Sequence, residues 1–255
     1  MLTIKKPDIS KLPGGWEPPF PSFILNEPTN IKKEVLFDNA FVLENVFTDN
    51  ECDLLIDLMQ QSPSCAPVSV HGRTDIPNYE VGSKRTTMWV PELAEQFWNK
   101  IKDSFENKIC DDFTPTDWWQ IKAYKNWEPY SISPLLRFMK YESGGQHFAH
   151  YDAGYIYEDS KYRTLMSFVV YLTTNDSGAT RFIHDGKGDI PVYDRKHDDW
   201  IHESLNEDVI CSVSPVKGNI LVFEHRICHD VERYIGTDPR IIIRGDITFK
   251  AIIDG

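Results

Sequence analysis

The segment from Arg137 to Gly154, RFMKYESGGQHFAHYDAG, contains two short β-strand patterns joined by a Gly-Gly turn. The second pattern ends with His150 and Asp152. Side chains two residues apart on a β-strand point to the same side, so an imidazole and a carboxylate are expected to project together. These two groups are part of a metal site of the kind that leaves coordination positions open.

Short strand patterns separated by turn signals continue to the end of the chain. The expected strands are 135–141, 147–152, 162–174, 179–184, 209–213, 219–223 and 240–252. A series of short strands without long helices between them favours a sandwich or barrel-like β core. The polar, acidic stretch 185–208 interrupts the series as a long insertion, which predicts a functional or disordered segment.

The N-terminal half predicts strands and two helices that flank this core. We expect an extended leader over 1–34, a strand over 35–47 and another over 83–90, with a loop over 62–80. Thr48 and Glu51 form a capping-box pattern, which predicts a helix to about residue 61. A second helix is expected from Pro91 to about residue 110, because apolar residues recur there at every fourth position. The aromatic stretch 118–130 is interpreted as a packed surface strand and loop rather than a substrate-facing wall.

The domain organisation that follows is a leader and one domain over 35–255. Within it, 35–133 forms the flank and 134–252 the β core. The fold class predicted is therefore mainly β with flanking helices.

Composition narrows the classes of partner and the compartment. The formal net charge of -12 argues against nucleic acid as a general partner, because phosphate binding needs a basic surface. The five cysteines are scattered and form no CxxC pair, which favours a reducing compartment such as the cytoplasm. The N-terminus has no secretory pattern, and no apolar stretch is long enough to span a membrane.

The last part of the chain offers a third metal ligand and a cation. His229 follows an apolar strand, with His225 as an alternative four positions earlier. Alternation then places Arg240, Arg244 and Asp246 on one face of the last strand, together with Ile242. A guanidinium on a core-like strand needs a partner, and an anionic ligand would provide one. Two histidines and a carboxylate form the facial triad of non-heme Fe(II) oxygenases.

The sequence resembles the iron- and 2-oxoglutarate-dependent dioxygenases, in particular the prolyl 4-hydroxylase-like branch. The resemblance covers about 135–250 and rests on three segments: LRFMKYESGGQHFAHYD, YRTLMSFVVYLTTNDSGATRF and VSPVKGNILVFEHRICHDVERYIGTDPRIIIRGDITF. It extends only loosely to the N-terminal region, through the expected strand, the helix start TDNEC and Arg85. It implies a double-stranded β-helix, or jelly-roll, core. The branch motif departs at Ser177-Gly178-Ala179, where a Gly-Gly pair is usual, and Thr180 is in place.

The resemblance also implies residue roles. It implies His150, Asp152 and His229 as iron ligands, Arg240 as the partner of the distal carboxylate of 2-oxoglutarate, and Tyr141 as a hydrogen-bond donor to that group. Three alternatives stay open. Arg244 is the substitute anchor, since Arg240 lies slightly far from the distal histidine; His225 is the substitute ligand. His147 also competes, but its spacing predicts that it faces away from Asp152.

The implied reaction consumes O2 and 2-oxoglutarate, and hydroxylates a C–H bond, with L-ascorbate as a reductant for the iron. The resemblance points to a prolyl residue of a peptide or protein as substrate, with a free amino acid or other small molecule as the alternative. Two further readings are a catalytically silent β-barrel binding module, which predicts a broken triad, and a zinc hydrolase, which would need a general base and no Arg240.

Overall fold

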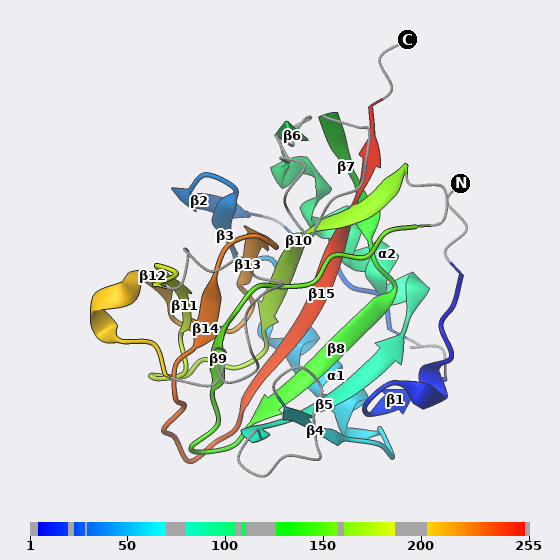
Figure 1. The fold of residues 1–255 in the computed structure, drawn as a ribbon. Helices are drawn as coiled ribbons and strands as arrows, with labels where there is room; N and C mark the ends of the chain where they lie inside the picture. The colour runs from blue at the N-terminus through cyan, green and yellow to red at the C-terminus, as the bar shows by residue number, and fades with distance from the viewer. Residues whose placement is uncertain are drawn as a thin grey trace.

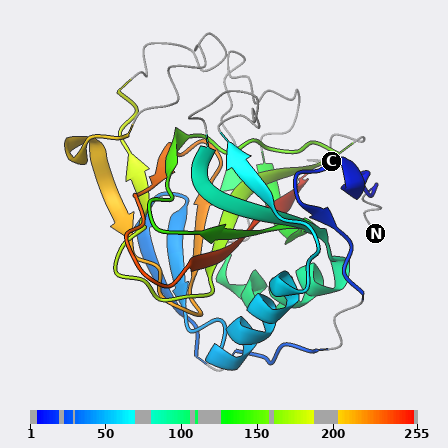
Figure 2. The ribbon, with the colours of Figure 1, turned by 90° about the horizontal axis from the view of Figure 1, so that it is seen from below.

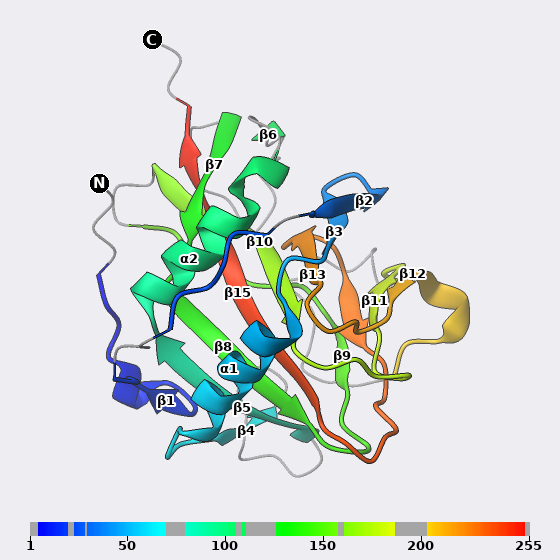
Figure 3. The same ribbon diagram turned by 180° about the vertical axis from the view of Figure 1, so that it is seen from behind.

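The computed structural model describes residues 5–19, 23–28, 30–69, 80–105, 109–110, 126–157, 161–186 and 203–252. The described strands form a sheet of eleven strands and a sheet of four. Helices α1 (Asp49–Gln60) and α2 (Pro91–Ile101) lie behind the large sheet in Figure 1 and in front of it in Figure 3. Figure 2 shows the two helices together along one side of the molecule. The fold is therefore mainly β with flanking helices around a jelly-roll core, as the sequence predicts.

The large sheet runs in the order β1 (Gly15–Trp16), β5 (Glu80–Trp89), β8 (Leu135–Tyr141), β15 (Arg240–Ala251), β10 (Tyr162–Tyr171), β13 (Ile220–Glu224), β3 (Ala40–Glu44) and β2 (Lys32–Phe37). Three strands attach beside this path: β4 (Ala66–Ser69) to β5, and β7 (Asn126–Ile132) to β15 and to β6 (Ile109–Cys110). The small sheet runs β12 (Val209–Val213), β11 (Thr180–Ile183), β14 (His229–Val231) and β9 (His147–His150). Three short 3-10 helices complete the described elements: η1 (Ile9–Lys11), η3 (Lys102–Ser104) and η6 (Asn206–Asp208).

Strand β10 shows why the core has two layers. Its side chains alternate between the two sides of the large sheet. Phe168 and Val170 join the core that also holds apolar residues of α1 and α2. Val169 and Tyr171 join the core that holds residues of the small sheet, such as Phe182. Both faces of β10 are buried, which explains why its sequence from Leu165 to Tyr171 is apolar except at Ser167.

The predicted helix starts are confirmed, and one predicted helix end is wrong. Thr48 and Glu51 form the capping box of α1, with each side chain bonded to the other residue's backbone N–H. Helix α2 begins at Pro91 but ends at Ile101, followed by η3. The four-residue apolar spacing continues beyond it, yet Ile109 lies in β6. Tertiary pairing with β7 therefore overrides the local helical periodicity there.

The expected single strand over 35–47 is also wrong. The structure has a hairpin, β2 and β3, with a turn at Asp38-Asn39 where Asn39 has φ 61°. An asparagine tolerates this left-handed conformation better than most residues, so the turn was readable in the sequence. The core strands agree with prediction more closely: β8 and β12 have the predicted limits, and the limits of β9, β10, β11, β13 and β15 differ by three residues or fewer.

Most of the polar insertion and of the aromatic stretch 118–130 lies outside the described residues. None of the described helices combines the length and the apolar character that a membrane span requires.

A buried ion pair fastens the leader to the domain. Lys100 Nζ lies 3.1 Å from Glu51 Oε1, and both side chains are under 5% exposed. Glu51 Oε1 also accepts a hydrogen bond from the backbone N–H of Asn26, at 2.7 Å. Lys100 donates to the carbonyl oxygens of Asn26 and Val46. Every group of this buried pair thus has partners, as a buried charge requires.

Candidate active site

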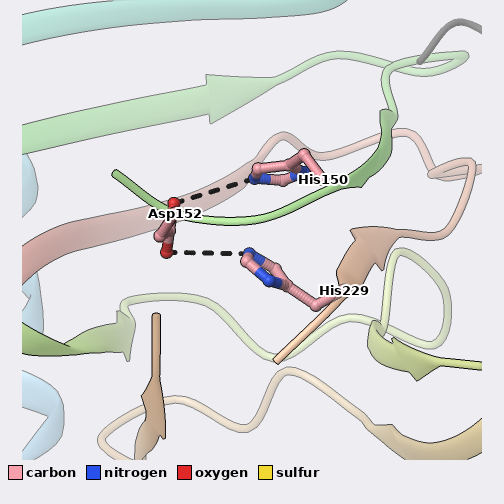
Figure 4. A group of neighbouring side chains, drawn as sticks. All are labelled: His150, Asp152 and His229. Carbon is pink, nitrogen blue, oxygen red and sulfur yellow. Dashed lines mark ion pairs between the residues drawn. The ribbon is translucent and has the colours of Figure 1, made fainter. Parts of the chain in front are cut away.

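His150, Asp152 and His229 come together at one end of the small sheet. Their ligand atoms all lie within 4.8 Å of one another. His150 Nε2 is 3.8 Å from Asp152 Oδ1, and His229 Nε2 is 3.7 Å from Asp152 Oδ2 (Figure 4). His150 and His229 are direct partners on the antiparallel strands β9 and β14, and Asp152 follows β9. The register between β9 and β14 therefore brings His150 and Asp152 next to His229, although they are far apart in the sequence.

A β-bulge in β9 corrects the prediction for His147. The paired positions are His229 with His150 and Val231 with His147, so three steps on β9 span two steps on β14. The extra residue puts both β9 histidines on the same side. Their rings stack with centroids 4.1 Å apart, and both line the same cavity. His147 thus faces the site, although it is not one of the three clustered groups.

Backbone carbonyl groups orient the two clustered histidines. His150 Nδ1 lies 2.7 Å from the carbonyl oxygen of Phe148, and His229 Nδ1 lies 3.0 Å from that of Ile227. With Nδ1–H donating to a carbonyl, Nε2 keeps its lone pair for a metal ion. Burial lowers the pKa of His150 to about 3, and burial also lowers the pKa of His229. Both imidazoles are therefore neutral near pH 7, which is the form that binds metals.

A network of buried polar groups holds Asp152. Burial alone would raise the pKa of this carboxyl group, but the Arg244 guanidinium 2.9 Å away and the neighbouring histidines together outweigh it, and the pKa lies well below 3.8. Ser167 donates a hydrogen bond to Asp152 Oδ2 and accepts one from Arg244. Arg244 also pairs with Asp246 at 3.0 Å, as the spacing on β15 predicts. The carboxylate is thus ionised and fixed in place.

His225 has a different place in this network. Its Nε2 lies 3.4 Å from Asp246 Oδ1, and it is not part of the cluster around Asp152. Arg137 Nη1 pairs with the other oxygen of Asp246, at 3.0 Å. His225 therefore lies beside Asp246, whose charge Arg137 and Arg244 already neutralise, and not beside Asp152.

Arg240 is completely buried and has too few partners. It begins β15 directly opposite Tyr141, the last residue of β8. Its guanidinium carbon lies 4.7 Å from the ring centre of Tyr141 and 5.8 Å from that of Tyr171. Its Nη2 donates a long hydrogen bond of 3.5 Å to the hydroxyl of Thr180, and Nε and Nη1 have no hydrogen-bond partner within the described parts of the chain. Buried polar groups without partners are rare and costly, so this arrangement indicates an anionic ligand.

Gly178 makes room for Arg240. It has φ +76°, and a Cβ atom there would lie 2.9 Å from Arg240 Cδ. A side chain at position 178 would therefore collide with that of Arg240. Thr180, two residues later, begins β11 and lines the same cavity as Tyr141 and the His-Asp-His cluster.

The cavity in front of these groups has a volume of about 350 Å³. One wall is apolar, with Val68, Met139 and Val169. The positive charge of the cavity lining comes from three arginines, Arg85, Arg137 and Arg244. Of these, only Arg244 was identified as a candidate site residue from the sequence. The cavity is large enough for a small ligand and one substrate side chain.

Residues 136–245 match the protein-family model of the 2OG-Fe(II) oxygenase superfamily. No curated protein sequence matches the chain. Solved structures with a similar fold include a viral collagen prolyl hydroxylase from Paramecium Bursaria Chlorella virus-1 in its 2OG complex (15% identity, TM-score 0.44, covering 85% of this chain and 97% of that one). A Pseudomonas putida prolyl-4-hydroxylase (13%, 0.45, 84% and 94%) and HygX from Streptomyces hygroscopicus with nickel and 2-oxoglutarate (12%, 0.48, 84% and 84%) are also similar.

Residues 136–245 are therefore similar to the 2OG-Fe(II) oxygenase superfamily, whose cofactors are Fe(II) and 2-oxoglutarate. The residues of this structure fit both. Two neutral imidazoles and an ionised carboxylate are a suitable donor set for Fe(II). The Arg240 guanidinium, whose Nε and Nη1 have no partner within the described residues, can bind a carboxylate of 2-oxoglutarate.

Sequence reasoning missed several groups that the fold brings to the site. Ser167 could have been found from the sequence, because it is the one polar side chain in the buried run SFVVYL and a buried hydroxyl needs a hydrogen-bond partner. Arg85 and Arg137 lie on β5 and β8, which also carry Lys84 and Lys140, so no spacing of basic residues in the sequence marks either arginine as a site residue. Only the pairing of β5 with β8 shows that both arginines line the cavity.

Proposed function

We propose that this protein is an Fe(II)- and 2-oxoglutarate-dependent dioxygenase that hydroxylates a C–H bond, with His150, Asp152 and His229 as the iron ligands. The observation that carries the proposal is the convergence of these three groups, all buried or partly buried, within 4.8 Å. A catalytically silent binding module would not need to maintain such a cluster, nor the network that keeps Asp152 ionised.

We further propose Arg240, rather than Arg244, as the anchor for the distal carboxylate of 2-oxoglutarate. Arg244 already pairs with Asp152 and Asp246. Arg240 keeps two unpartnered nitrogen atoms, counted over the described residues, and its charge is otherwise balanced only by aromatic faces. Tyr141 and Thr180 contact Arg240 and line the cavity, so their hydroxyl groups serve the same carboxylate. A zinc hydrolase would have no use for this arrangement.

When bound, Fe(II) with 2-oxoglutarate and dioxygen supplies the oxidising power for hydroxylation, and 2-oxoglutarate leaves as succinate and carbon dioxide. The chain's own residues hold and orient the reactants. His150, Asp152 and His229 would hold the metal through three ligand atoms, a set that is typical of sites with open positions for further ligands. The apolar wall of the cavity keeps water away from the reacting C–H bond.

For the substrate we propose a prolyl residue of a peptide or protein. This rests on the sequence resemblance of 135–250 to the prolyl 4-hydroxylase-like branch. A free amino acid or another small molecule is the second candidate, and the volume of about 350 Å³ favours it, since that is near the lower end for small-molecule pockets. We place the reaction in a reducing compartment such as the cytoplasm, with ascorbate as a reductant, since the five cysteines are scattered along the chain and form no CxxC pair.

The proposal is tested by turnover of 2-oxoglutarate. Purified protein with Fe(II), ascorbate and a broad panel of prolyl peptides and amino acids is expected to form succinate, and the hydroxylated product adds one oxygen atom by mass spectrometry. The matched control is the Asp152→Asn variant, which keeps the shape of the side chain but removes its charge. Wild-type protein that binds Fe(II) and forms no succinate with or without any substrate would contradict the proposal.

A further inference from the structure

The cavity wall carries more positive charge than its surroundings neutralise. Three guanidinium groups line it, those of Arg85, Arg137 and Arg244, against one carboxylate, that of Asp152. Behind the wall, Asp246 pairs with Arg137 and Arg244. This excess of cations lies in a chain whose formal net charge is -12, so it is a local feature of the site.

Arg85 is the cation that remains without a partner. Its guanidinium forms no hydrogen bond or ion pair with any residue that the structure describes, and its Nε is buried. Burial, followed by the nearby charges of Arg137 and Arg244, lowers the pKa of Arg85 to about 10. The group still carries its charge near pH 7, at a cost in free energy that a bound anion would offset.

The position of Arg85 makes it accessible to a substrate. It lies on β5, directly opposite Met139 on β8 and Ala66 on β4. Met139 and Val68 line the cavity with it, so the guanidinium is set in an apolar wall where charge interactions are stronger than in water. The distal carboxylate of 2-oxoglutarate is already assigned to Arg240. The free charge of Arg85 therefore suits a different ligand.

We propose that Arg85 binds a carboxylate group of the substrate and selects substrates that carry one close to the hydroxylated carbon. The inference deepens the proposed function and rests on it. The planar fork of a guanidinium suits a carboxylate, which it binds through two parallel hydrogen bonds. The carboxylate comes either from an aspartate or glutamate beside the target residue of a peptide, or from the α-carboxylate of a small molecule.

Two matched pairs of probes test this and separate the two sources. One pair is N-acetyl-L-proline and N-acetyl-L-prolinamide. The other is a blocked tetrapeptide with glutamate before proline and the same peptide with glutamine. Binding is measured by calorimetry on protein holding Fe(II) and 2-oxoglutarate without oxygen, and on protein holding neither. In at least one pair the carboxylate member is expected to bind about 10- to 100-fold more tightly, since a hydrogen-bonded charge contributes about that much.

The variants assign the preference to Arg85. Arg85→Gln is expected to lose the preference for the carboxylate probe. Arg85→Lys is expected to retain part of that preference, because the positive charge remains. Lys84→Gln is the control for net charge, since Lys84 is the exposed neighbour on the same strand, and it should keep the full preference. Thermal unfolding of each variant shows that it is folded.

Two results would overturn the inference: no preference for the carboxylate in either pair, or a preference that Arg85→Gln retains, as it would if the probes occupied the Arg240 site. Failure of the proposed function gives a different result, because wild-type protein would then not bind 2-oxoglutarate at all. The titrations without metal and cosubstrate still report on Arg85 in that case.

Discussion

Replacing Arg240 by methionine removes a charge and keeps most of the volume of a buried side chain. In the ligand-free protein the guanidinium has one long hydrogen bond, to Thr180, and stacks on Tyr141 and Tyr171. Its loss forfeits a cation–π interaction of about 1–2 kcal/mol but also removes an unneutralised buried charge. We therefore expect the free energy of unfolding of the ligand-free protein to change by less than about 2 kcal/mol.

Binding of 2-oxoglutarate should respond much more strongly. Truncating one partner of a buried, hydrogen-bonded charge pair costs about 2–5 kcal/mol, which is about 30- to 5,000-fold in dissociation constant. The expected signature of Arg240→Met is thus nearly unchanged stability, unchanged metal affinity and a large increase in the KM for 2-oxoglutarate. The assays are urea unfolding without ligands, calorimetry with Mn(II) and succinate formation at varied 2-oxoglutarate.

Arg244→Met is the matched comparison. It leaves Asp152 without its ion-pair partner and Asp246 with only Arg137 and His225, so we expect destabilisation of about 3 kcal/mol or more. The reasoning is refuted if Arg240→Met leaves the KM for 2-oxoglutarate unchanged, or if it destabilises the ligand-free protein as much as Arg244→Met does.

Three further predictions concern the metal site and the leader. His229→Ala should reduce Mn(II) affinity more than 100-fold, and His225→Ala less than tenfold, in calorimetry; the reverse order would exchange their roles. Ser167→Ala should weaken Mn(II) binding about 10- to 100-fold, as expected for a group that orients a ligand carboxylate, and equal affinity would remove it from that role. Burial raises the pKa of Glu51, but bonds from the Thr48 backbone and from Lys100 outweigh it, so the folded pKa lies below 4.5. The stabilisation of the folded protein by ionised Glu51 is complete above pH 4.5, the pKa of this group in the unfolded chain, and is lost as the pH falls below 4.5 toward the folded pKa. Glu51→Gln should therefore cost about 3–5 kcal/mol at pH 7 and flatten the loss of stability below pH 4.5 in urea unfolding; an unchanged acid dependence would contradict this.

Local patterns in the sequence were sufficient for most of the core. Alternation and turn residues predicted β8 and β12 with their limits, and the capping box predicted the start of α1, because these signals depend on neighbours a few residues apart. Beyond Ile101 the local signal failed. The sequence beyond Ile101 has helical spacing, but Ile109 and Cys110 form strand β6, which pairs with β7. The hydrogen bonds to a strand that is distant in the sequence cannot be predicted from the spacing of apolar residues.

For the site, the sequence by itself determined the residue types: an HxD pair, a later histidine and an arginine on the last strand. The tertiary structure decided their relations. A bulge in β9 turns His147 toward the cavity. The pairing of β5 with β8 brings Arg85 to the wall of the same cavity. Which arginine is neutralised depends on carboxylates from other strands, so only the folded chain separates Arg244, already paired, from Arg240 and Arg85, which are not. The physical reason is that charge neutralisation depends on distances in space, and sheet register sets those distances.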